Sequence, residues 1–103
     1  MPSDKTSNVT RFATVVRGKD QVSADVSDEV VILALNAGEY YSLAAVGARI
    51  WEVIHEPRTV QEIVGVLLME YDIDPERCAR DLVALVQQLA DAGLVEVSDA
   101  ATP

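Results

Sequence analysis

Few side chains in this 103-residue sequence have types and spacings that suit catalysis. The single histidine, His55, stands between Glu52 and Glu56, and no nucleophile or polarising group accompanies it. We therefore interpret His55 as a residue at the C-terminal end of a helix, interacting with the helix dipole. The single cysteine, Cys78, lies near two arginines and a predicted helix N-terminus, which would lower a thiol pKa, but its apolar stripe favours inert packing. The sequence predicts no enzyme.

Cofactor and metal sites are also not expected. The acidic segment 70–74 lacks the glycine and the spaced ligands of a calcium-binding loop, which favours a solvated turn between helices. One cysteine and one histidine cannot form a zinc site or an internal disulfide. The sequence contains no glycine-rich phosphate loop and no Ser/His/Asp set.

Charge is distributed unevenly along the chain. The formal net charge is −9, although residues 1–19 carry four basic side chains and only one acidic side chain. Proteins that bind nucleic acid need a basic surface, because contacts to phosphates supply most of their affinity. The acidic remainder of the chain would repel DNA, so we do not expect a nucleic-acid partner. We expect a partner with a basic or apolar surface.

The length predicts one domain, for which we expect the range 21–97. Residues 1–20 are mostly polar and are interpreted as a flexible tail, with 12–16 available for a short strand, and residues 98–103 as a disordered end. No apolar run approaches the roughly 20 residues of a membrane span. The first 19 residues lack the apolar stretch of a signal peptide, so we expect a cytoplasmic protein without a membrane partner.

Alternation and β-branched residues predict three strands in the first half of the domain. Residues 21–26 alternate apolar and polar side chains, residues 29–35 read EVVILAL and are apolar after Glu29, and residues 39–43 read EYYSL. Asn36-Ala37-Gly38 supplies a hairpin turn. These segments predict an antiparallel meander.

Helical spacing dominates the second half. We expect helices over 44–55, from Thr59 to about 71 and from Asp74 to about 92, with a last short strand over 94–97. Thr59 and Glu62 form a capping box, and Asp74 precedes a proline at the first helical position. The predicted fold class is α+β, a winged helix-turn-helix-like domain with a three-stranded antiparallel sheet followed by three helices.

The last helix has an apolar arc of about 160°, wider than the roughly 100° that a core needs. It comprises two stripes at the same spacing, Cys78/Leu82/Leu85/Leu89 and Ala79/Val83/Val86/Ala90. Either the sheet covers one stripe and a helix the other, or the smaller stripe, Ala79 to Ala90, lines an open groove for a partner.

The third strand would lie at an edge of the meander. EYYSL contains neither proline nor lysine, so nothing in it prevents a visiting strand from pairing. An edge strand beside a partly covered helix suits the capture of an extended peptide by strand addition. The alternative is that the tail or a second copy of the chain covers this edge.

At VILALNAGEYYSLAAVGARIWEVI the sequence resembles the PqqD-like leader-recognition family of ribosomally synthesised, modified peptides (RiPPs). PRTVQEIV, EYDIDPE, RDLVALVQQL and GLVEV follow in the family's order, so the resemblance spans about residues 22–97. Tyr40-Tyr41 together with Gly47-Ala48-Arg49-Ile50-Trp51 looks most like the stand-alone members of lasso-peptide biosynthesis. The long polar N-terminus is not part of the family pattern.

The resemblance implies a non-catalytic, cofactor-free protein that binds the leader of a precursor peptide. The leader would add to the third strand, pack on the last helix and be passed to a leader peptidase and a cyclase. The residues implied to contact the leader are Glu39, Tyr40, Tyr41, Ser42 and Leu43 for its backbone, Ala79, Val83, Val86 and Ala90 for its apolar anchors, and Arg80 and Asp81 for its charges.

Two other functions stay open at this point. A winged-helix transcription regulator would place the last helix in the major groove of DNA, where Arg77, Arg80, Gln87 and Gln88 would be its contact residues. A subunit that stimulates a processing enzyme would dock through acidic helix faces. In either case, the free edge strand is compatible with a monomer or a weak dimer.

Overall fold

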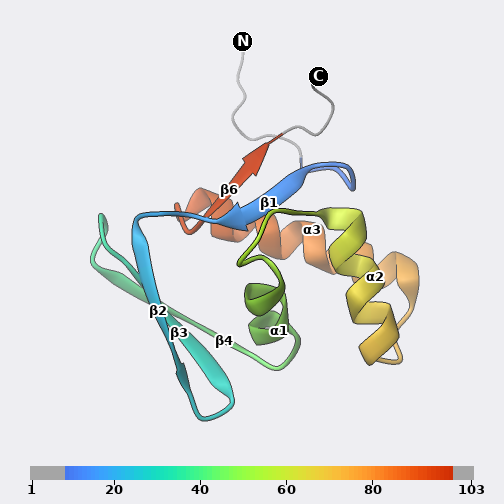
Figure 1. Ribbon diagram of the computed structural model, residues 1–103, viewed down its shortest axis with the longest axis horizontal. Coiled ribbons are helices and arrows are strands. Elements are labelled where there is room, and N and C mark those ends of the chain that lie inside the picture. The colour runs from blue at the N-terminus through green and yellow to red at the C-terminus, as the bar shows by residue number, and fades with distance from the viewer. Residues whose placement is uncertain (1–8, 99–103) are drawn as a thin grey trace.

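The computed structural model describes residues 9–98 and contains two small sheets and three helices (Figure 1). The elements in chain order are β1 (Thr14–Arg17), β2 (Gln21–Val26), β3 (Glu29–Ala34), β4 (Glu39–Ala44), α1 (Val46–Val53), β5 (Arg58–Thr59), α2 (Val60–Glu70), α3 (Pro75–Asp91) and β6 (Val95–Ser98).

The predicted meander is confirmed. Strands β2, β3 and β4 form an antiparallel sheet in that order, with Val22 opposite Leu33 and Leu33 opposite Tyr40. Gly38 in the β3–β4 turn has a φ of 69°, a conformation that glycine adopts without steric cost. The fold is therefore α+β, with this sheet followed by three helices.

The helix boundaries follow the capping signals. Thr59 Oγ1 accepts a hydrogen bond from the Glu62 amide at 3.1 Å, and the Glu62 side chain accepts one from the Thr59 amide at 3.0 Å. This is the expected capping box, and it begins α2. Asp74 accepts a hydrogen bond from the Arg77 amide at 2.9 Å, and Gly93, with a φ of 78°, follows the end of α3. Helix α1 is shorter than predicted, since it occupies only Val46–Val53.

The flexible tail predicted over residues 1–20 is corrected by the structure where that range is described. Residues 14–17 form β1, which pairs with β5 on one side and with β6 on the other. The Val15 side chain is fully buried, because this second sheet closes one end of the core. The ordered domain thus begins before residue 21. Residues 1–8 of the tail and residues 99–103 of the predicted disordered end lie outside the described residues.

The core lies between the inner face of the β2–β3–β4 sheet and the helices. Val30, Ile32 and Ala34 of β3 point into it, together with Trp51 of α1. The Trp51 indole donates a hydrogen bond to Ser23 Oγ at 3.1 Å, so the inner face of β2 also contacts α1. The expectation that Trp51 is a core residue is confirmed.

Arg17 connects the second sheet to the same tryptophan. Its Nε donates a hydrogen bond to the Trp51 carbonyl at 2.9 Å, and its guanidinium lies 4.8 Å from the centre of the indole ring. Burial lowers the pKa of Arg17, although carboxylates of Asp25 and Glu52 oppose that shift. The contact fixes β1 against α1 and adds a cation–π interaction.

Candidate peptide-binding site

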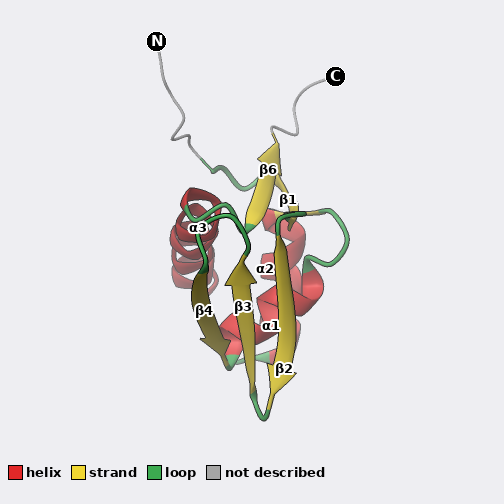
Figure 2. Ribbon diagram, turned by 90° about the vertical axis from the view of Figure 1, so that its left-hand side faces the viewer, coloured by secondary structure: helices red, strands yellow, loops and turns green. Residues whose placement is uncertain are grey.

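Strand β4 is an edge of the β2–β3–β4 sheet, as predicted. Within residues 9–98 it pairs with β3 on one side and with no strand on the other. Figure 2 shows α3 beside this open edge, with β4, β3 and β2 following in that order. The backbone N–H and C=O groups along the unpaired edge of β4 are therefore free to pair with an extended chain that enters between β4 and α3.

The chain turns sharply from β4 into α1 at Ala45, which has a φ of 54°. A positive φ is unfavourable for a residue with a Cβ atom, so this corner holds some strain. The turn brings Gly47 against β4, where a Cβ atom at Gly47 would lie 3.5 Å from the Leu43 side chain. The start of α1 thus extends the surface of β4 toward α3.

A groove with a volume of about 590 Å³ lies between the start of α1 and α3. Its apolar lining comes from all three helices and from the α2–α3 turn, and the charged side chains lie on α3 and in the same turn. We call it the α3 groove, and its lining residues are Val46, Gly47, Ile50, Leu67, Asp72, Ile73, Asp74, Arg77, Cys78, Asp81, Leu82 and Leu85.

The charge in the α3 groove is mostly negative. Arg77 Nε lies 3.8 Å from Asp81 Oδ2, an exposed pair one helical turn apart. Asp72 and Asp74 add two more carboxylates, and Asp74 also caps α3. An occupant with apolar anchors and a basic side chain therefore fits this groove better than an acidic one.

The five predicted residues of β4 are divided between the two faces of the sheet. Tyr41 and Leu43 lie on the inner face and are partly buried, whereas Tyr40 lies on the outer face and is exposed. The Tyr41 hydroxyl donates a hydrogen bond to Glu39 Oε1 at 2.9 Å, which raises the pKa of Tyr41. The Ser42 hydroxyl donates to Glu29 Oε1 at 2.7 Å.

The predicted pocket residues of α3 need correction. Val86 is fully buried in the core, and Ala79 lines a different hollow between α2 and α3. Val83 and Ala90 are partly buried and lie on the same flank as Ala79. None of these four residues lines the α3 groove.

The physical reason is the rotation of α3. The core takes the centre of its apolar arc, which combines Val86 from one predicted stripe with three residues from the other. The groove then lies on the flank of Leu85, and Ala79 lies on the opposite flank, beside α2. In the sequence, a large apolar residue, Leu85, on the helix flank of the Arg77/Asp81 pair could have indicated the position of the groove.

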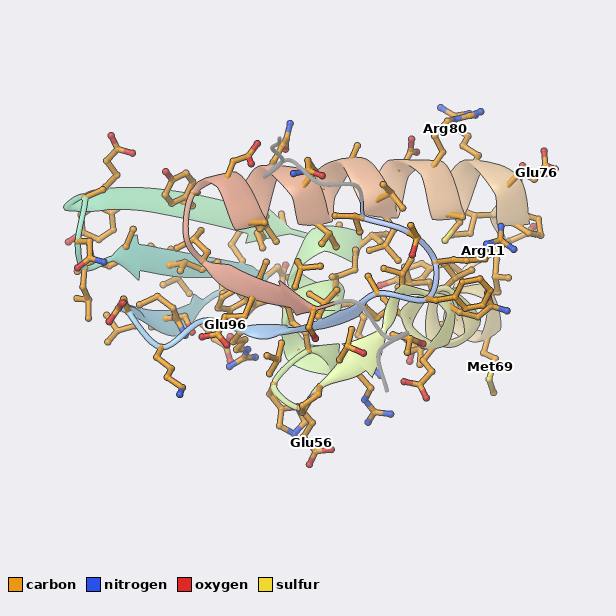
Figure 3. The ribbon with its side chains drawn as sticks, turned by 90° about the horizontal axis from the view of Figure 1, so that it is seen from above. Arg11, Glu56, Met69, Glu76, Arg80 and Glu96 are labelled. Carbon is orange, nitrogen blue, oxygen red and sulfur yellow. The ribbon has the colours of Figure 1, made fainter. Side chains whose placement is uncertain are left out.

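The two predicted charged residues are separated by the same rotation. Asp81 lines the α3 groove, and its pairing with a peptide charge stays a prediction. Arg80 projects from α3 away from both sheets (Figure 3) and is not in the groove lining. The basic residue of the groove is instead Arg77, which the sequence had suggested only for DNA.

An exposed ion-pair network, not found from the sequence, connects α1 with α2. Arg49 donates two hydrogen bonds to the Glu70 carboxylate, at 2.8 and 2.7 Å, and a third to Glu52 at 3.1 Å. These contacts raise the pKa of Arg49 and lower that of Glu70. The network positions α1, whose first turn lines the groove.

The cysteine and the histidine, the side chains considered for catalysis, have structural roles. Cys78 is buried, and burial together with the charge of Asp81 raises its thiol pKa, which opposes the thiolate that a nucleophile needs. His55 Nδ1 lies 2.8 Å from the Glu52 carbonyl at the end of α1. Within residues 9–98, no group of three or more His, Cys, Asp or Glu side chains is arranged to hold a metal ion.

Sequence comparison identifies the family. Residues 29–95, which include β3, β4, all three helices and the start of β6, match the family described as coenzyme PQQ synthesis protein D, PqqD. The chain belongs to the PqqD family. This confirms the PqqD-like resemblance, and the match includes both β4 and the α3 groove.

Two solved structures are similar to this PqqD-family chain. TbiB1 in complex with the TbiA(β) leader peptide is 40% identical, with a TM-score of 0.74 over 79% of this chain and 94% of that chain. A lasso peptide synthetase B1 complexed with its leader peptide has a TM-score of 0.72 over 80% of this chain and 96% of that chain. The second is 23% identical and supports the fold alone.

Among curated protein sequences, none matches this PqqD-family chain at a comparable significance. No helix within the described residues has the length and apolar character needed to cross a membrane.

Proposed function

We propose that this protein binds the leader segment of a ribosomally synthesised precursor peptide in lasso-type biosynthesis. The observation that carries the proposal is the free edge of β4 beside the apolar α3 groove. The leader complex of TbiB1, a protein 40% identical to this one, supports it independently.

In the proposed complex the leader forms a fourth strand on β4. Its backbone pairs with residues 39–43, and this pairing supplies affinity without regard to sequence. Side chains of a strand alternate between faces, so every second leader residue would point into the α3 groove. Leu82 and Leu85 would contact apolar anchors there.

Charged leader residues would be recognised at the rim of the groove. Asp81 of α3 and Asp72 of the α2–α3 turn would favour a basic leader side chain. Arg77 of α3 would pair with an acidic leader side chain. Such rim pairs are solvent-exposed, so they contribute to specificity and association rate more than to affinity.

The role is one of presentation, with no catalysis by this chain. Burial of Cys78 and the engagement of His55 with a backbone carbonyl hold the single cysteine and the single histidine of the chain in structural roles. The bound leader would be presented to a separate leader peptidase, and then to a cyclase, of the same pathway. The charge of −9 opposes DNA binding, which the transcription-regulator alternative requires.

Strand addition makes a periodic prediction for the leader. Replacing leader amides one at a time by N-methyl amides should weaken binding at alternate positions only, because only every second N–H points toward β4. We expect a loss of about tenfold or more at those positions, since a hydrogen bond is lost and a methyl group obstructs pairing.

The measurement is fluorescence polarisation with a set of singly N-methylated peptides. The cognate leader and the TbiA(β) leader serve as the two parent sequences, and a scrambled peptide is the control. Equal losses at consecutive positions, or none at any position, would exclude strand addition as the binding mode.

A further inference from the structure

Gly47 occupies an ordinary helical position, although helices disfavour glycine. It lies in the first turn of α1, and the glycines with a positive φ are Gly38 and Gly93. Apart from proline, glycine is the least favourable residue in a helix, because it loses the most backbone freedom on folding. The backbone conformation at position 47 therefore gives no reason for a glycine there.

Internal packing does not require a glycine at position 47 either. A Cβ atom at Gly47 would lie 3.5 Å from both Cβ and Cδ2 of Leu43, which is ordinary van der Waals contact. At Gly18, by comparison, a Cβ atom would lie only 3.1 Å from the Leu94 carbonyl oxygen, so close packing explains that glycine. Alanine at position 47 therefore fits the free protein without displacing β4 or α1.

The open side of Gly47 faces the α3 groove, where Leu82 and Leu85 of α3 belong to the same lining. Strand β4 ends at Ala44, three residues before Gly47, so a leader strand that extends past the last pair on β4 reaches this level. The groove volume of about 590 Å³ falls within the range of about 300–1,000 Å³ for pockets that hold small molecules. A large leader side chain therefore has room beside Gly47.

Both walls of the groove are fixed at this level. Ile50 and Trp51 anchor α1 in the core, and Arg49 joins α1 to the end of α2 by two hydrogen bonds. On the other side, Leu82 of α3 is buried. Because neither helix can move outward without breaking core contacts, a methyl group added at position 47 would take its volume from the groove.

We propose that Gly47 determines the size of the leader side chain that the α3 groove accepts. This inference rests on the proposed function. A large apolar anchor of the leader packs directly against the Cα atom of Gly47, in the space that a side chain at position 47 would fill. Helix α1 is thus less stable than it would be with alanine, and the missing side chain serves recognition. A chain of this fold with alanine at the same position would select a smaller anchor.

The test is Gly47→Ala in the full chain, with Gly65→Ala as the matched control. Gly65 is an exposed helical residue of α2 outside the α3 groove lining, and a Cβ atom there would meet no packing neighbour within 4 Å. Both substitutions should raise the melting temperature by about 2–8 °C, because alanine is the better helix former. Circular dichroism melting curves measure this shift.

Leader affinity should separate the two variants. We expect Gly47→Ala to bind the synthetic cognate leader about tenfold more weakly than the wild type, since a surplus methyl group in a packed site costs about that much. Gly65→Ala should bind as the wild type does. Fluorescence polarisation measures both, with the TbiA(β) leader as a second probe. Higher stability together with weaker binding indicates a contact with the leader, because a general loosening of the fold would lower both.

Alanine substitutions along the leader locate the anchor. When the anchor itself is replaced by alanine, Gly47→Ala and the wild type should bind that leader equally, because the added methyl group then meets no large side chain. At other leader positions the tenfold difference between the two proteins should persist. This coupling distinguishes a direct contact at position 47 from an indirect effect on the groove.

Equal affinity of Gly47→Ala and the wild type for the unmodified leader would overturn the inference and leave the proposed function intact. A difference that persists at every leader position would also overturn it, because no anchor would then contact Gly47. A lower melting temperature for Gly47→Ala would contradict it as well, since packing within the free protein would then require the glycine. Absence of leader binding by the wild type would refute the proposed function itself.

Discussion

Leu85→Asp is expected to weaken leader binding by about 100-fold or more while the domain stays folded. Leu85 lies at the wall of the α3 groove and is only partly buried, so a carboxylate there remains hydrated in the free protein. A bound leader would cover that carboxylate without pairing it, and Asp81 would add repulsion. A 100-fold loss corresponds to about 2.7 kcal/mol, within the range for burying an unpaired polar group.

Ala84→Asp is the matched control, since it adds the same charge at the adjacent, exposed position outside the groove lining. Val86→Asp provides the opposite comparison, because its side chain is fully buried and a charge there should unfold the domain. Fluorescence polarisation with the labelled leader and circular dichroism melting curves measure the two effects. Equal leader affinity for Leu85→Asp and the wild type would show that the peptide does not enter this groove.

Trp51→Ala should lower the free energy of unfolding by about 3–5 kcal/mol, the range for truncating a large buried aromatic residue. The indole is 1% exposed, donates a hydrogen bond to Ser23 and lies under the Arg17 guanidinium. Its removal therefore leaves a cavity and separates contacts that join both sheets to α1. Urea unfolding followed by circular dichroism measures the change.

Trp51→Phe and Ser23→Ala separate the components of this effect. Phenylalanine keeps an aromatic ring but loses the indole N–H, and Ser23→Ala removes only the acceptor, which should cost about 0.5–1.5 kcal/mol. If Trp51→Ala unfolds at the same urea concentration as the wild type, Trp51 does not hold the core together as described.

The elements that the sequence predicted well depend on local signals. Thr59 and Glu62 satisfy each other's backbone groups within one turn, so the start of α2 follows from four residues. Asp74 and Pro75 begin α3 in the same way. Strand β4 as an edge was also predictable, because three short strands joined by tight turns form a meander with the third strand outside.

Short strands over 12–16 and 94–97 were expected, but their association into a second sheet was not predictable because the pairing is non-local. β1 finds its partners at Arg58–Thr59 and at residues 95–98, and β5 has only two residues, too few for a periodic pattern. The mostly polar composition of residues 1–20 indicated a tail, whereas pairing of β1 with β5 and β6 accompanies burial of the Val15 side chain.

The sequence also did not determine which face of β2 and which face of α3 point into the core. Alternation in β2 predicted which side chains share a face, but Val22 and Val26 lie on the outer face and not in the core. On α3, two apolar stripes of equal spacing left the rotation of the helix undetermined, and Val86 was assigned to the groove instead of the core. Periodicity specifies a face, and only tertiary packing decides what covers it.

Hydrogen exchange with and without saturating leader tests the central claim most directly, because within residues 9–98 both edges of the β2–β3–β4 sheet are unpaired and only one is proposed to bind. Alternate backbone amides of β4, residues 39–44, should become protected when the leader binds, while the amides of β2, residues 21–26, keep their exchange rates. Protection along β2, or leader binding without new protection in β4, would contradict the proposed site.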